Sequence, residues 1–140
     1  MTDHGKILTV DDDETNRMVV RVLLERRGYQ VVEASSGSEA LELFDEHSFH
    51  LILMDLAMPG MDGLETTRCI RRHHKGSHVP VVALTANTTL SDQAKCHDAG
   101  MNAVLQKPFD PQQFDRLMYL LNSEEAGKDD SETDSANHPP

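Results

Sequence analysis

Two patterns of apolar residues follow one another five times along this chain: a short continuous apolar run, and then apolar residues separated by polar ones. Short, continuous apolar runs are typical of strands buried on both faces, and apolar residues spaced three or four positions apart are typical of amphipathic helices. The runs predict five strands, at Lys6–Val10, Gln30–Ala34, Leu51–Asp55, Val79–Thr85 and Ala103–Gln106. The spaced residues predict five helices, at about Asn16–Arg27, Ser38–Glu46, Asp62–Lys75, Ser91–Ala99 and Asp110–Leu121. Alternating strands and helices with short connections imply an α/β fold, with a parallel sheet and helices on both faces.

The same pattern assigns faces and ends to the helices. In the first helix, the spacing places Val19, Val22 and Leu23 on the buried face. Asp62 and Asp110 stand where the third and fifth helices begin, and aspartate is a favourable N-cap residue. The fifth helix is expected to bury Phe114, Leu117, Met118 and Leu121.

No apolar repeat continues beyond Leu121. The segment 122–140 holds six acidic residues and one basic residue, together with Ser, Gly, Asn and Pro. Such a segment cannot bury enough apolar surface to order itself. We therefore expect one folded domain over residues 1–121 and an acidic disordered tail or linker over residues 122–140.

Charge and cysteine content limit the binding partners and the cellular compartment that the sequence is compatible with. The 140 residues carry a net charge of −11, which argues against direct binding of nucleic acid or of an anionic membrane. No apolar run approaches the ~20 residues needed to span a bilayer, and the first residues lack the apolar stretch of a signal peptide. Cys69 and Cys96 fall within helical patterns and match no metal-binding spacing, which favours free thiols in a reducing compartment. We expect a cytoplasmic protein.

Polar residues of related chemistry follow several of the predicted strands. In open parallel sheets, ligands bind at the carboxyl edge, where these residues stand. If the first and third strands are neighbours, their carboxylates crowd together, and a hard divalent cation such as Mg²⁺ relieves the repulsion. With a hydroxyl and an amine added, the group can hold a phosphoryl group while one aspartate attacks it in line. The residues concerned are Asp11, Asp12, Asp13, Asp55, Thr85 and Lys107.

Four of these features, in this order, resemble the receiver domain of two-component response regulators, the CheY-like family. They are the acidic pair after the first strand, the aspartate within Met54–Gly63, Thr85-Ala86 after the fourth strand, and the sequence 107–109, Lys-Pro-Phe. The resemblance covers residues 6–121 and looks closest to the receivers of hybrid histidine kinases and phosphorelays. It implies a doubly wound (βα)5 flavodoxin-like three-layer sandwich, with a parallel five-stranded sheet in the order 2-1-3-4-5.

The resemblance also implies a role for each residue in phosphoryl transfer. Asp55 is expected to accept a phosphoryl group from a phosphohistidine, which makes the chain a signalling phosphoacceptor that catalyses its own phosphorylation and slow dephosphorylation. Thr85 is expected to hydrogen-bond the phosphoryl group and Lys107 to pair with it. The peptide bond between Lys107 and Pro108 is expected to be cis.

A magnesium site belongs to the same expectation. The resemblance implies that Asp12 ligates Mg²⁺ directly and that Asp11 does so through water. Asp55 and the backbone carbonyl of Ala57 complete the ligands that the protein supplies. Asp13 lies beyond the acidic pair, and we interpret it as a surface residue of the loop.

Partners follow from the same family. A histidine kinase or a histidine-phosphotransfer protein is expected to dock beside Asp55, on the exposed side of the first helix at Asn16, Arg17 and Val20. The output face is expected to be the fourth helix, fifth strand and fifth helix, which would bind a downstream protein target or a fused output domain. Many receivers carry an aromatic switch residue three positions before the lysine. Val104 stands there, so that switch cannot operate in its usual form.

Two alternatives remain open at this point. The residues 11–15 also fit the Asp-x-Asp-x-Thr signature of haloacid-dehalogenase-like phosphatases, in which Asp11 would be the nucleophile and Asp13 the acid and base. That reading leaves Asp55 without a role and lacks the acidic metal motif expected after the lysine. The other alternative is a degenerate receiver that acts only as a binding module.

Overall fold

The structure is a computed structural model that describes residues 5–73, 76, 78–86 and 89–134. The chain divides into two compact units, residues 1–109 and 110–140. The first unit contains all five strands and four of the helices, and the second contains the last helix.

The five strands of the first unit form one parallel sheet. They are β1 (Lys6–Val10), β2 (Gln30–Ala34), β3 (Leu51–Asp55), β4 (Val81–Thr85) and β5 (Ala103–Gln106). Their order across the sheet is β2-β1-β3-β4-β5, and every neighbouring pair is parallel. The predicted flavodoxin-like fold class is therefore confirmed. The direction of winding reverses between β1 and β3, which makes their carboxyl ends the switch point of the sheet.

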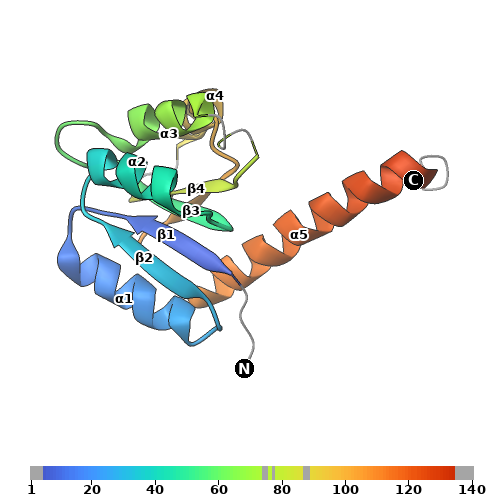
Figure 1. The fold of residues 1–140 in the computed structure, drawn as a ribbon, viewed down its shortest axis with the longest axis horizontal. Helices are drawn as coiled ribbons and strands as arrows, with labels where there is room; N and C mark the ends of the chain where they lie inside the picture. Colours follow the sequence, from blue (N-terminus) through green and yellow to red (C-terminus); the bar gives the residue numbers. More distant parts are fainter. Residues whose placement is uncertain (1–4, 74–75, 77, 87–88, 135–140) are drawn as a thin grey trace. The chain divides into compact units, whose positions relative to one another are not determined.

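Four helices connect these strands. They are α1 (Glu14–Glu25), α2 (Gly37–Glu46), α3 (Gly63–Arg72) and α4 (Leu90–Ala99). Helices α2, α3 and α4 lie on one face of the sheet and α1 lies on the other (Figure 1). Strand β4 begins two residues later than predicted, directly after Pro80, which has no N–H to donate to a neighbouring strand.

The core of the first unit is built from aliphatic side chains with few aromatic ones. All five residues of β3 are buried, as expected for a central strand covered on both faces. The largest fully buried side chains of the sheet are Ile7, Leu8, Val10, Leu51, Ile52, Leu53, Met54, Val81 and Val82.

Helix α1 buries a different face from the one that the sequence pattern indicates. Val20 and Leu24 are buried, whereas Val19 and Val22 are exposed. Six of the seven residues 18–24 are apolar, so the spacing alone fits two overlapping faces. The start of the helix is set by Asp13, whose carboxylate accepts a hydrogen bond from the backbone N–H of Asn16 at 3.0 Å.

One arginine joins two loops at the amino edge of the sheet. Arg71 of α3 donates hydrogen bonds to the backbone carbonyls of Gly76, Val79 and Gly100, at 2.9, 2.7 and 2.9 Å. It also donates to the side-chain oxygen of Asn102 at 2.8 Å, and that oxygen accepts a second bond from the N–H of Val81. The guanidinium thereby connects the loop before β4 with the loop before β5.

The second unit contains α5, which spans Pro111–Asp134. The backbone N–H of Gln112 donates to the Asp110 carboxylate at 2.9 Å, in agreement with the predicted cap. Phe114 and Met118 are buried, also as predicted. The helix continues past Leu121 to Asp134, although the apolar pattern has ended. No helix in the described ranges has the length and apolar content to cross a bilayer.

The observed face of α1 can be tested with two matched substitutions. Val20 is 4% exposed and Val22 is 37% exposed. We expect Val20→Ala to lower the free energy of unfolding by about 2 kcal/mol, because it removes two buried methyl groups and leaves a void. Val22→Ala should change it by less than about 0.5 kcal/mol. Urea unfolding followed by circular dichroism measures both values, and equal losses would contradict the observed face.

Candidate functional site

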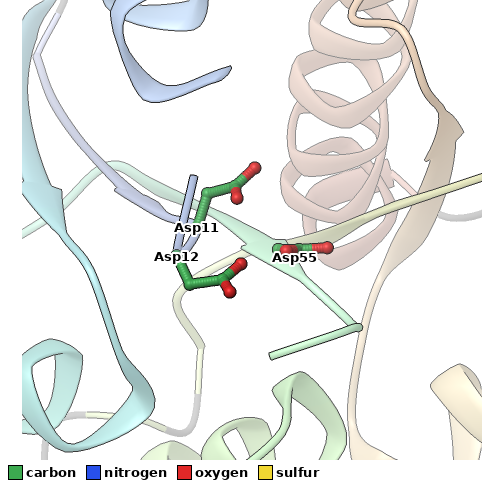
Figure 2. A group of neighbouring side chains, drawn as sticks. All are labelled: Asp11, Asp12 and Asp55. Atoms are coloured by element: carbon green, nitrogen blue, oxygen red, sulfur yellow. The ribbon is translucent and has the colours of Figure 1, made fainter. Parts of the chain in front are cut away.

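Three carboxylates gather at the carboxyl edge of the sheet. Asp11 and Asp12 follow β1, and Asp55 ends the adjacent β3 (Figure 2). One oxygen from each carboxylate lies within 4.8 Å of the others. Asp11 and Asp55 are only 3% and 2% exposed, whereas Asp12 is exposed to solvent. The crowding predicted from the strand ends is therefore present in the structure.

Backbone N–H groups hold the two buried carboxylates in place. The N–H of Asp13 donates to Oδ1 of Asp11 at 2.9 Å, and the N–H of Ala57 donates to Oδ1 of Asp55 at 3.2 Å. In both cases the donor is two residues further along the chain, the arrangement of an Asx turn. Each acidic side chain is thus oriented by the loop that it begins.

Lys107 supplies the positive charge that faces these acids. Its Nζ lies 2.9 Å from Oδ1 of Asp55 and 3.8 Å from Oδ2 of Asp11. The backbone N–H of Lys107 donates to the carbonyl of Thr85 at 2.8 Å, which ties the loop after β5 to the end of β4. The peptide bond between Lys107 and Pro108 is cis, as expected from the sequence.

The electrostatics of the site reflect this crowding. Burial raises the pKa of Asp11, and the neighbouring charge of Asp55 raises it further, while the hydrogen bond from the Asp13 N–H and the charge of Lys107 oppose the change. Burial alone would lower the pKa of Lys107, but the hydrogen bond and charge of Asp55, with the charges of Asp11 and Asp12, outweigh burial and raise it. Lys107 is therefore held in its charged form, whereas burial and the neighbouring charge of Asp55 disfavour the charged form of Asp11.

The remaining site residues from the sequence lie nearby in the fold. Thr85 ends β4, one residue after the position that pairs with Asp55. Ala57 contributes its N–H to Asp55, as described above. Asp13 does not join the acidic group, because its carboxylate caps α1. Val104 is half buried on β5 and packs against the core.

Two of the three residues expected to form a docking surface on α1 are engaged inside the molecule. Val20 is buried, so the prediction that it lies on the exposed side of α1 is wrong. Arg17 donates hydrogen bonds to Glu33 and to the carbonyl of Asp11. Asn16 is exposed, as predicted. The exposed side of α1 is formed instead by Asn16, Met18, Val19 and Val22, because the helix is turned by about one residue from the predicted face.

A glycine behind Asp55 was not singled out from the sequence. Gly63 begins α3, and a methyl group built on it would collide with the backbone carbonyl of Asp55. The Gly63 N–H donates to the carbonyl of Leu56 at 3.4 Å. The start of α3 can therefore lie directly against the end of β3 only because this position has no side chain.

The donor set suits a hard divalent cation. Carboxylate oxygens are the ligands that Mg²⁺ prefers, usually one or two carboxylates with several waters. Three aspartates with one lysine leave an excess of negative charge, and the raised pKa of Asp11 shows that a buried carboxylate lacks full compensation. The residues present therefore fit a cation at this position, with exposed Asp12 on the solvent side.

The acidic cluster and the lysine that faces it thus lie together at the switch point of a flavodoxin-like α/β sheet. Residues 7–118 match the family model described as the response regulator receiver domain. The chain belongs to this family.

Two relatives show that domains of this family occur in proteins of very different length. The chain is 39% identical over 106 residues to the CAI-1 autoinducer sensor kinase/phosphatase CqsS of Vibrio cholerae, covering 75% of this chain and only 16% of that protein. It is 36% identical over 108 residues to the polar-differentiation response regulator DivK of Brucella ovis, covering 77% of this chain and 88% of that one. The matched region thus occurs both inside a large kinase and as a nearly complete small protein.

Solved structures agree with this assignment. The chemotaxis protein CheY4 of Vibrio cholerae is 30% identical with a TM-score of 0.79, covering 82% of this chain and 96% of that one. The receiver domain of the sensor histidine kinase PA1611 of Pseudomonas aeruginosa is 37% identical with a TM-score of 0.75, covering 81% of this chain and 93% of that one. That structure holds a magnesium ion coordinated in its active site cleft.

The cost of the buried charge on Asp11 leads to a stability prediction. Because folding raises the pKa of Asp11, its charged form destabilises the folded state at neutral pH. We expect Asp11→Asn to raise the melting temperature at pH 7 in the presence of EDTA, since asparagine keeps an oxygen for the Asp13 N–H and loses the charge. Asp13→Asn removes a neighbouring charge and keeps the helix cap, and should give no comparable rise. A fall in melting temperature for Asp11→Asn would contradict this account of the site.

Proposed function

We propose that this chain is a phosphoacceptor receiver domain in which Asp55 takes a phosphoryl group from a phosphohistidine. The observation that carries the proposal is a buried aspartate at a strand end, with Lys107 2.9 Å from Oδ1 and two further carboxylates beside it. A carboxylate oxygen of Asp55 forms a bond to phosphorus as the bond between phosphorus and the histidine nitrogen breaks. With its other ring nitrogen protonated before transfer, the histidine keeps the electron pair of the broken bond and leaves as neutral imidazole, and Asp55 becomes an acyl phosphate.

The contacts of Asp55 indicate which of its oxygens attacks. Oδ1 accepts hydrogen bonds from the N–H of Ala57 and from Lys107 Nζ. These bonds orient the carboxylate and leave Oδ2 to approach the phosphorus in line. Lys107 can then transfer its hydrogen bond to a phosphoryl oxygen, and the hydroxyl of Thr85 binds another. Binding the arriving group with groups already in place avoids the cost of reorganising them.

We further propose that Asp11, Asp12, Asp55 and the backbone carbonyl of Ala57 hold Mg²⁺. When bound, the ion neutralises charge on the phosphoryl oxygens during transfer. The three aspartates concentrate enough negative charge at one place to bind the ion. The magnesium in the related PA1611 receiver supports this choice of metal.

The donor protein is proposed to be a histidine kinase or a histidine-phosphotransfer protein. A groove of about 350 Å³ lies beside the acidic site in the first unit. Its lining is mostly apolar and comprises Asp11, Asn16, Val19, Val20, Leu84, Lys107, Pro108 and Phe109. A helix that presents its histidine to Asp55 can place apolar side chains in this groove.

We also propose a cytoplasmic location, which the free Cys69 and Cys96 support.

Phosphorylation is proposed to alter binding through the fourth helix, fifth strand and fifth helix. The recipient is a downstream protein target or a fused output domain. Val104 lacks the aromatic ring that many receivers move in this region, so the change must reach β5 through other groups. Lys107 is placed to begin it, because its backbone joins the end of β4 and its side chain contacts Asp55.

The phosphatase alternative has weaker support. It requires Asp13 to act as acid and base, but the Asp13 carboxylate caps α1 and is not part of the acidic cluster. The binding-only alternative would leave the buried and opposed charges of Asp55 and Lys107 without a purpose. Neither alternative is favoured by a specific contact in the described structure.

The proposal is tested by offering a small-molecule phosphodonor. Incubation with acetyl phosphate and Mg²⁺ should add the mass of one phosphoryl group, measured by intact-protein mass spectrometry. Asp55→Asn should abolish the added mass, because the amide is a poor nucleophile, while Asp13→Asn should retain it. Reduction with borohydride should then locate the modified residue at position 55. An unmodified wild-type protein, or label at another residue, would contradict the proposal.

The metal site is tested by binding measurements on two neighbouring aspartates. We expect Asp12→Asn to weaken Mg²⁺ binding by about tenfold or more, because it removes a carboxylate from a site with few protein ligands. Asp13→Asn removes the same charge one residue away and should change the affinity by less than about threefold, through long-range electrostatics alone. Isothermal titration calorimetry measures both, and equal effects would show that the acidic loop acts only as diffuse charge.

A further inference from the structure

Arg17 contacts the acidic loop in a way that none of the roles above explains. Its Nη1 donates a hydrogen bond of 2.7 Å to the backbone carbonyl of Asp11, and its Nε pairs with Oε1 of Glu33 at 3.1 Å. The side chain is only 15% exposed. Arg17 therefore lies against the loop, with its guanidinium fixed between β2 and the end of β1.

A second arginine completes this group. Arg21, one turn later on α1, pairs with the other oxygen of Glu33, Oε2, at 2.9 Å. Glu33 thus accepts from both arginines, and only Arg17 reaches the loop. The rigid fork of a guanidinium allows Arg17 to bind the carboxylate and the carbonyl at once.

The backbone of Asp11 is consequently held on both sides. Its N–H donates to the carbonyl of Ala34 at 3.1 Å, and its carbonyl accepts from Arg17. That carbonyl belongs to the peptide group joining Asp11 to Asp12. Its orientation therefore decides where the Cα of Asp12, and with it the exposed Asp12 carboxylate, stands relative to Asp55.

We propose that Arg17 is a positioning residue for the metal and phosphoryl site, acting through the peptide group between Asp11 and Asp12. This inference rests on the proposed function, because the site it serves is the proposed magnesium site. Mg²⁺ requires near-octahedral geometry with short bonds to oxygen, so a small rotation of the loop lowers affinity even though every ligand remains. Groups that orient metal ligands typically contribute 10- to 100-fold to metal affinity.

The positive charge of Arg17 and its positioning role should have opposite effects on Mg²⁺ affinity. The direction in which affinity changes when Arg17 is replaced therefore tells the two apart. A positive charge near a cation site repels the cation. If Arg17 affected the site only through charge, Arg17→Met would strengthen Mg²⁺ binding. If it positions the loop, Arg17→Met weakens binding in spite of the lost charge.

Arg21→Met is the matched control. It removes an identical charge from the same helix and the same partner, Glu33, but leaves the bond to the Asp11 carbonyl intact. Arg17→Lys keeps the charge and lacks the fork, so it can reach either the carbonyl or Glu33 but not both. We expect the loss of affinity for Arg17→Lys to be intermediate.

The experiment measures Mg²⁺ affinity of the intact chain by calorimetry. We expect Arg17→Met to raise the dissociation constant by about tenfold, and Arg21→Met to leave it unchanged or lower it slightly. The backbone amide resonance of Asp12 in ¹⁵N NMR, which senses the hydrogen bond to the Asp11 carbonyl, should shift in the Arg17 variants and not in Arg21→Met. Labelling by acetyl phosphate should slow for Arg17→Met at low Mg²⁺ and recover at saturating Mg²⁺.

Each failure has a separate meaning. If the wild-type chain binds no Mg²⁺, the proposed function fails, whatever Arg17 does. If the wild type binds and Arg17→Met binds as well or better, with the Asp12 amide unmoved, the positioning role is wrong. Urea unfolding of each variant guards against general destabilisation, and a folded Arg17→Lys with wild-type affinity and an unmoved Asp12 amide would also overturn the inference. Acetyl phosphate does not dock on α1, so a defect seen only with a kinase donor would assign Arg17 to partner binding instead.

Discussion

The closeness of two buried carboxylates, opposed by one lysine, is the constraint on which the site depends. Asp11 and Asp55 come together because β1 and β3 are hydrogen-bonded neighbours, and neither can move away without breaking the centre of the sheet. Repulsion between them is only partly balanced by Lys107, so the folded chain holds an unfavourable excess of negative charge. The same excess of negative charge would favour a bound cation at this edge of the sheet, as proposed above.

Much of the fold could be predicted because its strands are so strongly apolar. The run Leu51–Met54 is buried on both faces and could be assigned without knowing its neighbours. Helix α1 shows where the pattern fails. Its two valines at positions 19 and 20 are chemically identical, yet Val20 is buried and Val19 is exposed. The tertiary contacts of a helix cannot be obtained from spacing when nearly every position is apolar.

The charged side chains of the candidate site could be predicted from the sequence, but the residues that hold them in place could not. Asp11 and Lys107 directly follow strands and Asp55 ends one, so the topology of a parallel sheet brings them together. Arg17 and Gly63 act through contacts with backbone carbonyls, which carry no signal in the side-chain sequence. An arginine on the polar side of a helix and a glycine after an aspartate have common explanations, solvation and helix capping. Only the structure distinguishes those explanations from close contact with the backbone carbonyls of Asp11 and Asp55.

Arg71 has a consequence for how the chain tolerates changes in length. Surface loops usually accept inserted residues. Here the loops before β4 and β5 present their acceptors, Gly76, Val79, Gly100 and Asn102, to one guanidinium at fixed spacing. An insertion in either loop would withdraw acceptors from a half-buried cation and leave its donors unsatisfied. These two connections should therefore have nearly constant length among homologous chains that keep the arginine, and length variation should concentrate elsewhere.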